Sequence, residues 1–264
     1  MTRIIFLAFL LIVTTTAGTA QTGGTWNGKK AAVVITYDDA IDEHLNNAIP
    51  LLDSLGLKAT FYVTGFSSSM QQRLNDWKRI ATNGHELGNH TLYHPCTGGT
   101  AGREWVRPDY DLRNYTVKRI LDEIRATNLL LQSMDGRTKR SFAFTCGDTR
   151  VGDTSFAPLL KNDFVAMRGV RSLMHPIGQV QLDNVDCYGV NGESGDQLVS
   201  WAKQAIATNS LLVVLFHGVG GGNSLNVSLP AHRQFLQFLK AHEQEIWIAP
   251  MINVAEYIKN YQGK

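Results

Sequence analysis

Apolar and polar residues alternate along this chain in two patterns, which together predict its secondary structure. Short runs rich in Val, Ile and Phe are typical of buried strands. We place such strands at 31–37, 59–63, 141–144, 164–168, 211–216 and 246–249, and a further short strand at 86–89, before His90. Longer segments repeat apolar residues every three or four positions, as amphipathic helices do. These predicted helices are 44–55, 70–83, 115–133, 153–162, 194–209, 230–242 and 251–260.

The predicted strands and helices follow one another in alternation, which indicates an α/β fold with a parallel sheet. About seven strand–helix units are the number expected of a β/α barrel. An open doubly wound sheet is the alternative, but no G-x-G-x-x-G motif follows the first strand. The sequence contains no internal repeat, no Pro-rich linker and no low-complexity segment, so we expect a single domain.

The first twenty residues differ in kind from the rest. A short basic start, MTR, precedes the apolar run IIFLAFLLIV and a segment that ends in small residues. This is the three-part pattern of a secretory signal peptide, with Gly18 and Ala20 suited to the cleavage site. The run is short for a bilayer, and an uncleaved anchor is the alternative. We expect residues 1–20 to be removed and the mature protein to be periplasmic or extracellular, without a membrane-spanning segment.

Charge and cysteine content limit the expected partners. The formal net charge is +2 and no long basic run occurs, so we expect neither a nucleic acid nor an anionic membrane as a partner. None of the three cysteines forms a C-x-x-C pair, which argues against a structural zinc site of that kind. In an exported protein, three cysteines allow at most one intramolecular disulfide.

Two adjacent carboxylates end the first predicted strand. The segment AAVVITY runs directly into Asp38 and Asp39. Aspartate is depleted in strands, and neighbouring like charges repel one another. A lone Asp in this position is usually a polar turn or a helix N-cap. A pair at the carboxyl end of a barrel strand, where barrel chemistry takes place, indicates a cation ligand or a catalytic carboxylate.

Three histidines follow two other predicted strands. His90 and His94 come after the strand at 86–89, and their spacing lets a helix or a tight turn bring both rings to one ion. With a carboxylate from a neighbouring strand they would make a His₂Asp set with one position open to water, as in catalytic zinc sites. His217 ends the apolar strand LLVVLF on the same rim. The alternative is that all three are ordinary loop histidines.

The motifs TYDD, HTLYH and LFHG, in this order and at these separations, resemble those of the polysaccharide deacetylases, the NodB-homology domain of carbohydrate esterase family four. The resemblance covers roughly residues 30–260. It implies a distorted (β/α) barrel of about seven parallel strands, which we place at 30–262 after a linker at 21–29. It also implies metal-dependent removal of acetyl groups from an N-acetylated glycan or O-acetylated xylan.

The resemblance also implies a role for each motif residue. By position, Asp38 corresponds to the general base, and Asp39, His90 and His94 correspond to the metal ligands. His217 corresponds to the general acid, which protonates the leaving amine or alkoxide. The implied cofactor is a divalent metal, zinc first, with cobalt or another divalent ion as alternatives.

The middle motifs depart from the family pattern. The third usually carries an Arg and a Pro, but the strand end here reads FAFTCGDT, with Thr145 where Pro is common. We expect Arg168, at the end of FVAMR, to orient Asp38, with Arg171 and Arg150 as alternatives. The fourth motif, with its Asp and Trp, is not recognisable near LDNVDCYGV.

The loop at 96–115 is long, and long ordered loops at a barrel mouth are often functional. Its Trp105 and Tyr110 are expected to stack on a sugar, or equally to pack the loop onto the barrel. Gly147 is a third expected substrate contact. The glycine run GVGGGNS after His217 either allows close approach of two chain segments or is a flexible connection.

Two of the three cysteines are expected on the catalytic rim. Cys96 follows the histidine motif, and Cys146 ends a strand that should be its neighbour. We predict a Cys96–Cys146 disulfide that ties down the loop after Cys96 and leaves Cys187 free.

Three functions remain open at this stage. The first is an exported deacetylase, acting as a monomer on an acetylated glycan. The second is an amidohydrolase of the same fold that acts on a small non-sugar amide. The third is a non-catalytic carbohydrate-binding protein, which the missing Arg favours and the complete set of five motif residues opposes.

Overall fold

A computed structural model describes residues 25–263 of the chain. Within this range nine strands form one curled sheet in the order β7-β4-β3-β2-β1-β10-β8, with β13 paired to β1 and β9 to β10. They are β1 (Ala31–Asp38), β2 (Thr60–Val63), β3 (Glu86–Asn89), β4 (Ser141–Ala143), β7 (Ala166–Arg168), β8 (His175–Pro176), β9 (Tyr188–Gly189), β10 (Ser210–Phe216) and β13 (Ile246–Ile248). All pairs are parallel except β8 with β10. The seven predicted strands and the predicted α/β class are therefore confirmed.

The segment 182–190, which is irregular apart from the two residues of β9, completes the wall between β7 and β10. On one side, Met167 of β7 donates to the Leu182 carbonyl and accepts from the Val185 amide, both at 2.7 Å. On the other side, the Val190 amide donates to the Leu215 carbonyl of β10 at 2.9 Å. Because irregular chain replaces regular strands here, the single domain is a distorted barrel, as predicted.

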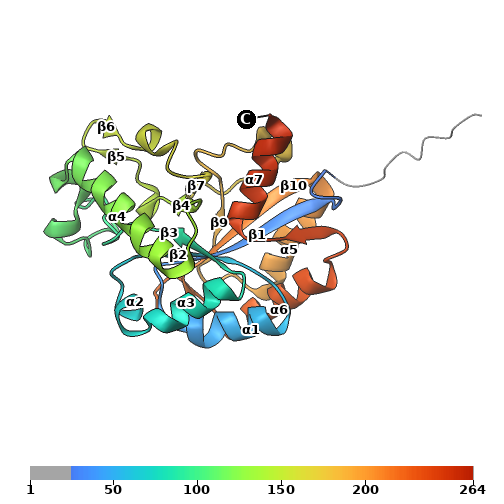
Figure 1. Cartoon of the computed structure of the whole chain (residues 1–264). Coiled ribbons are helices and arrows are strands. Elements are labelled where there is room, and N and C mark those ends of the chain that lie inside the picture. The colour runs from blue at the N-terminus through green and yellow to red at the C-terminus, as the bar shows by residue number, and fades with distance from the viewer. Residues whose placement is uncertain (1–24, 264) are drawn as a thin grey trace, which may run out of the picture.

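Helices cover both sides of the sheet. They are α1 (Ile49–Ser54), α2 (Ser68–Gln72), α3 (Leu74–Thr82), α4 (Val117–Asp135), α5 (Gly195–Thr208), α6 (Leu229–Ala241) and α7 (Met251–Gln262). Figure 1 shows α1, α3 and α6 on one side of the sheet and α7 on the other. The side chains of Thr116, Ser194 and Ser228 accept hydrogen bonds from amides in the first turns of α4, α5 and α6. These caps bind backbone donors that have no partner within the helix.

Two predicted helices take a different form. The segment 44–55 begins as a π-helix (His44–Ala48) and continues as α1, where Pro50 lies in the first turn and has no backbone N–H to donate. The segment 70–83 is split into α2 and α3 at Arg73, whose φ of −128° is not helical.

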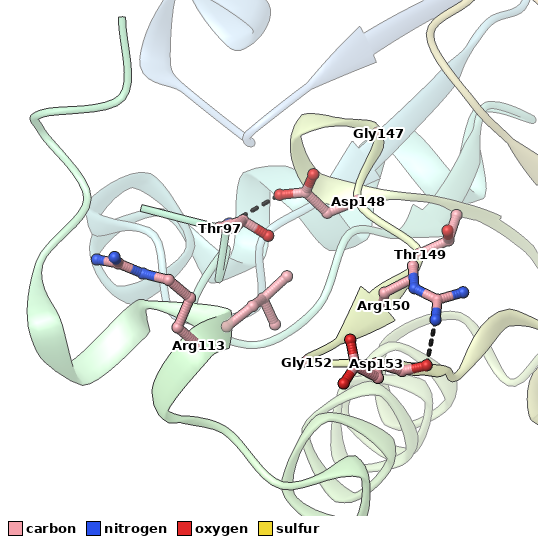
Figure 2. A pocket seen from close by; sticks show the side chains of 9 residues that line it. Thr97, Arg113, Gly147, Asp148, Thr149, Arg150, Gly152 and Asp153 are labelled. Carbon is pink, nitrogen blue, oxygen red and sulfur yellow. Dashed lines mark hydrogen bonds between the residues drawn. The ribbon is translucent and has the colours of Figure 1, made fainter. Parts of the chain in front are cut away.

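The prediction of a helix at 153–162 is wrong. A small antiparallel hairpin, β5 (Arg150–Val151) with β6 (Thr154–Ser155), turns through Gly152 and Asp153 (Figure 2). Only a 3₁₀ turn, Ala157–Leu160, follows it. Pro158 lies in the first turn of that short helix, and inside a longer helix it would break the backbone hydrogen bonding.

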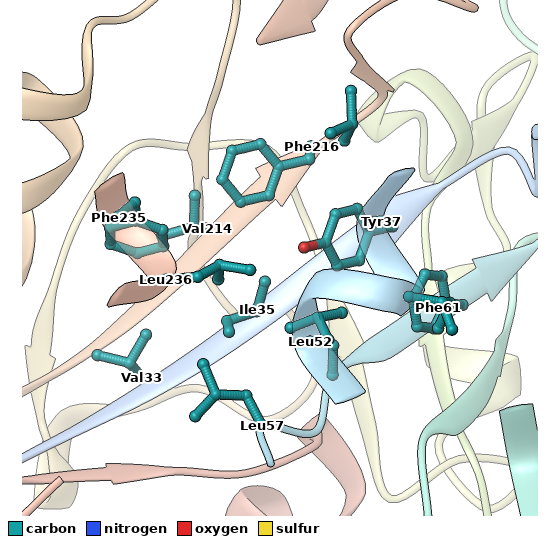
Figure 3. Close-up of a cluster of buried hydrophobic side chains, with 14 of the residues drawn as sticks. Val33, Ile35, Tyr37, Leu52, Leu57, Phe61, Val214, Phe216, Phe235 and Leu236 are labelled. Atoms are coloured by element: carbon teal, nitrogen blue, oxygen red, sulfur yellow. The ribbon is translucent and has the colours of Figure 1, made fainter. Parts of the chain in front are cut away.

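The core lies between the sheet and its helices, and strand alternation decides which side chains enter it. Odd-numbered residues of β1, such as Val33, Ile35 and Tyr37, pack with α1 and α6 in the cluster of Figure 3. Even-numbered residues such as Ala32 and Val34 pack on the opposite face with α7. Because both faces are covered, the whole strand is buried and its sequence is apolar throughout.

The same alternation places two motif residues on one face of the sheet. Asp38 continues the even-numbered series of β1, which faces α7. His217 directly follows β10 and continues the series Leu211, Val213 and Leu215, which faces the same side. Because β1 and β10 are paired neighbours, Asp38 and His217 lie at adjacent strand ends.

Within residues 25–29, the described part of the predicted linker, Trp26 packs against the domain. Trp26 is fully buried, and its Nε1 donates to the Asn209 carbonyl at 2.8 Å. The predicted signal peptide, residues 1–20, lies outside the described residues. Among residues 25–263, no helix is both long and apolar enough to cross a membrane.

Candidate active site

Asp38 and Asp39 reach one site because the backbone turns between them. Successive strand residues point to opposite faces of a sheet, so adjacent carboxylates would normally point apart. Asp39 instead has a φ of 84° and Ala40 a φ of 55°, both in the left-handed region that non-glycine residues seldom adopt. As a result, both carboxylates lie 3.6 Å from the same atom, Nε2 of His90. Such backbone strain costs about 1–3 kcal/mol per residue and clusters at functional sites.

His90 and His94 lie on a tight turn after β3, one of the two conformations that their spacing allows. The Asn89 side chain accepts from the Thr91 amide at 2.8 Å, and the Thr91 hydroxyl accepts from the His94 amide at 2.9 Å. His94 itself has a φ of 57°. This turn brings the two ring centroids to 4.9 Å from each other.

The His90 ring has the tautomer that a metal ligand needs. Its Nδ1 lies 2.8 Å from the Ala143 carbonyl, which can only accept, so Nδ1 carries the proton. Nε2 therefore has the free lone pair. Burial lowers the pKa of His90 to about 4, so the ring is neutral near pH 7.

Asp39, His90 and His94 fit a divalent metal ion. One ligand atom from each lies within 4.8 Å of the others. Asp39 Oδ1 lies 3.4 Å from His94 Nε2 and is buried without a hydrogen-bond partner among the described residues. Ligand atoms at about 2.0–2.2 Å from a tetrahedral zinc ion are roughly 3.4 Å apart. The spacing and the donor types therefore fit a divalent metal ion.

Arg168 forms a buried ion pair with Asp38, which is the contact expected of a residue that orients this carboxylate. Its Nη2 donates to Asp38 Oδ2, and both side chains are almost fully buried. Burial is the largest single influence on the pKa of Asp38 and acts to raise it, but the charge and hydrogen bond of Arg168 together with the charges of His90 and His217 lower the pKa below its ordinary value. The Arg168 guanidinium also lies 5.2 Å from the centre of the Tyr62 ring. The other two candidate arginines do not contact Asp38. Arg171 donates hydrogen bonds to Asp186, and Arg150 donates one to the Asp153 carbonyl.

We expect Arg168→Met to lower the free energy of unfolding by about 3–5 kcal/mol, because it leaves the buried Asp38 charge without a partner. Arg171→Met is the matched control. Arg171 is an exposed side chain, and His175 remains as a partner for Asp186 at 2.7 Å, so we expect little or no change in the free energy of unfolding. Urea unfolding of both variants measures the difference. Equal losses in the two variants would show that the buried Arg168–Asp38 ion pair contributes no more to stability than the exposed Arg171 side chain does.

His217 follows β10, and a second histidine holds its backbone. His217 Nδ1 is buried and has no partner among residues 25–263. The His217 carbonyl lies 2.8 Å from His44 Nε2, which donates to it. Burial lowers the pKa of His44 to about 4, so its ring stays neutral. The sequence pattern does not predict this role of His44, because a buried histidine in a helix gives no local signal of such a contact.

These groups line a single cavity of about 880 Å³. Its walls include Asp38, Asp39, His90, His94, Trp105, Arg168, His217 and Asn223. Trp105 is 57% exposed, and its ring centroid lies 6.1 Å from that of His94, so it stands at the mouth of the cavity.

The other two predicted substrate contacts lie outside this cavity. Tyr110 stacks on Tyr93 with ring centroids 5.4 Å apart, which packs the loop down. Gly147 lines a neighbouring cavity of about 460 Å³, together with Thr97, Arg113 and Asp148 (Figure 2). In that cavity the Thr97 amide donates to the Asp148 carboxylate at 2.7 Å.

The predicted Cys96–Cys146 disulfide is confirmed, and Cys187 is a free, buried thiol. Both disulfide sulfurs lie near His94, but each is bonded to the other, so they are not available as metal ligands. The disulfide fixes the start of the loop at 96–115 beside the cavity.

Comparison with known proteins identifies one family. Residues 26–157, half of the chain, match the sequence model of the family described as polysaccharide deacetylase. A peptidoglycan-N-acetylglucosamine deacetylase of Bacillus cereus is 40% identical over 67 residues, which are 25% of this chain and 24% of that protein. A peptidoglycan-N-acetylmuramic acid deacetylase of Bacillus subtilis is 26% identical over 112 residues, 42% of this chain and 36% of that protein. The matches thus span well under half of these relatives.

A solved structure agrees in fold. The peptidoglycan deacetylase PdaC from Bacillus subtilis superimposes with a TM-score of 0.54 and 17% identity, over 88% of this chain and 94% of that one. At this level of identity, the similarity shows a shared fold and no more.

Proposed function

Because the chain belongs to the polysaccharide deacetylase family, we propose that it is an exported, metal-dependent hydrolase that removes acetyl groups from a glycan. One observation carries this proposal. The ligand atoms of Asp39, His90 and His94 gather within 4.8 Å in the same cavity that holds Asp38 and His217.

Asp39, His90 and His94 would hold the metal, most suitably zinc, with cobalt or another divalent ion as alternatives. A bound ion of this kind polarises the acetyl carbonyl and lowers the pKa of its water toward about 7. The chain supplies one carboxylate and two imidazoles, which leaves a position for water.

Asp38 acts as the general base through a defined atom. Arg168 occupies Oδ2, whereas Oδ1 is buried without a partner among the described residues. Oδ1 is therefore the oxygen that accepts the proton from the attacking water. The lowered pKa of Asp38 keeps this carboxylate ionised and ready to accept it.

His217 acts as the general acid. Protonated, it gives a proton to the leaving nitrogen or oxygen, which otherwise departs as a strong base. The hydrogen bond from His44 holds the His217 backbone at the end of β10, so the ring keeps its place at the cavity wall.

An acetylated glycan is the substrate that the cavity suits best. Trp105 at the mouth offers an aromatic face on which a sugar ring can stack. The curated relatives named above are peptidoglycan deacetylases, which makes an N-acetylated glycan the first candidate and O-acetylated xylan the second. The predicted signal peptide supports export, with the mature chain beginning at Gln21.

Acetate release tests this function. We expect the protein to release acetate from N-acetylglucosamine oligomers, peptidoglycan or acetylxylan, to lose this activity with a chelator and to regain it with Zn²⁺. A small non-sugar amide completes the panel. Release from that amide alone would indicate an amidohydrolase, and glycan binding without release would indicate a non-catalytic protein. N-terminal sequencing of protein from the exported fraction checks the cleavage after Ala20.

A further inference from the structure

Strand pairing and hydrogen bonds hold both ends of the loop that follows β10. Its flanking strands, β11 (Gly218–Val219) and β12 (Asn226–Val227), pair in parallel. Asn47 donates to the Val219 carbonyl at 2.7 Å, and the Asn226 side chain accepts from the Gly221 amide at 2.9 Å. The loop is therefore an ordered part of the cavity wall.

Gly222 lets this loop approach the segment that follows Asp39. Its φ is 82°, and a Cβ at this position would collide with the Glu43 carboxylate. Any other residue would therefore be strained and would displace Glu43. Of the two interpretations of the glycine run, close approach is the one that the geometry supports.

The next residue, Asn223, contacts Asp39. Asn223 Oδ1 accepts from the Leu225 amide at 2.9 Å, which fixes the orientation of the side-chain amide. Asn223 Nδ2 therefore faces Asp39 and donates to its Oδ2 at 3.1 Å. With Oδ2 engaged, the other oxygen, Oδ1, is the one that lies near His90 and His94.

We propose that Asn223 is a positioning residue for the metal site, which holds Asp39 so that Oδ1 alone is directed at the metal. The inference rests on the proposed function, because it assigns Asp39 as a ligand. Asp39 is in a strained backbone conformation and its side chain is 21% exposed, so packing alone does not fix its carboxylate. Hydrogen bonds from the outer shell fix the orientation of metal ligands and commonly change metal affinity or activity by about 10–100-fold.

The test compares Asn223→Ala with Asn226→Ala in the full chain. Both remove an amide that binds a backbone N–H within the loop, but only Asn223 also touches Asp39. Zn²⁺ affinity is measured by competition with a chromophoric chelator, beside the visible spectrum of bound Co²⁺, which reports coordination geometry. We expect Asn223→Ala to weaken Zn²⁺ binding by about 10–100-fold and to change the Co²⁺ spectrum. Asn226→Ala should leave both close to wild type.

Two results would overturn the inference. In the first, Asn223→Ala keeps the wild-type affinity and spectrum. In the second, Asn226→Ala shows the same loss, so that loop order and not the contact with Asp39 is responsible. Thermal unfolding of the metal-free variants shows whether each one is folded. If the wild-type protein itself binds neither Zn²⁺, Co²⁺ nor any other divalent metal ion, the proposed function fails, and this inference fails with it.

Discussion

Asp38→Asn should lower deacetylase turnover by a factor of about 10²–10⁴ while the metal stays bound. Asparagine cannot accept the proton of the attacking water, but Asp39, His90 and His94 remain as ligands. Elemental analysis beside turnover measures both quantities. Added metal should not restore the activity, because the ion was never lost.

Asp39→Asn is the matched comparison one residue away. It removes the anionic ligand from the three-residue set, so metal content and activity should fall together, and excess metal should restore part of the rate. If Asp38→Asn lost the ion and Asp39→Asn kept it, the two roles would be reversed. If both variants kept metal and activity, the pair would be only a polar strand end.

His217→Ala should cost about 10²–10⁴ in rate on an N-acetylated sugar and far less on a nitrophenyl acetate. A nitrophenolate leaves readily without a proton, whereas an amine leaving group needs one. The ratio of the two losses therefore measures general-acid catalysis.

The control for this experiment is Asp38→Asn, which should slow both substrates because both reactions need an activated water. Equal losses of His217→Ala on the amide and the ester would instead assign His217 a binding or structural role.

Local sequence patterns are enough to predict the strands and the polar residues that end them. Apolar runs predict buried strands because both faces of this sheet are covered, and β1 is buried along its whole length. Asp38 and His217 could be located because each ends such a run on the rim where barrel chemistry occurs, and His90 because it lies four residues before His94. These are local signals, which need no knowledge of the neighbouring strands.

Contacts between groups that are distant in the sequence depend on how the elements pack together. Arg168 reaches Asp38 from 130 residues away, and Asn223 reaches Asp39 from 184 residues away. His44 reaches the carbonyl of His217 in the same way. Hydrophobic periodicity reports which face of an element is buried, but not which side chains meet across the barrel. The left-handed turn at Asp39 likewise has no sequence pattern of its own, because only the packed rim holds that residue in a strained conformation.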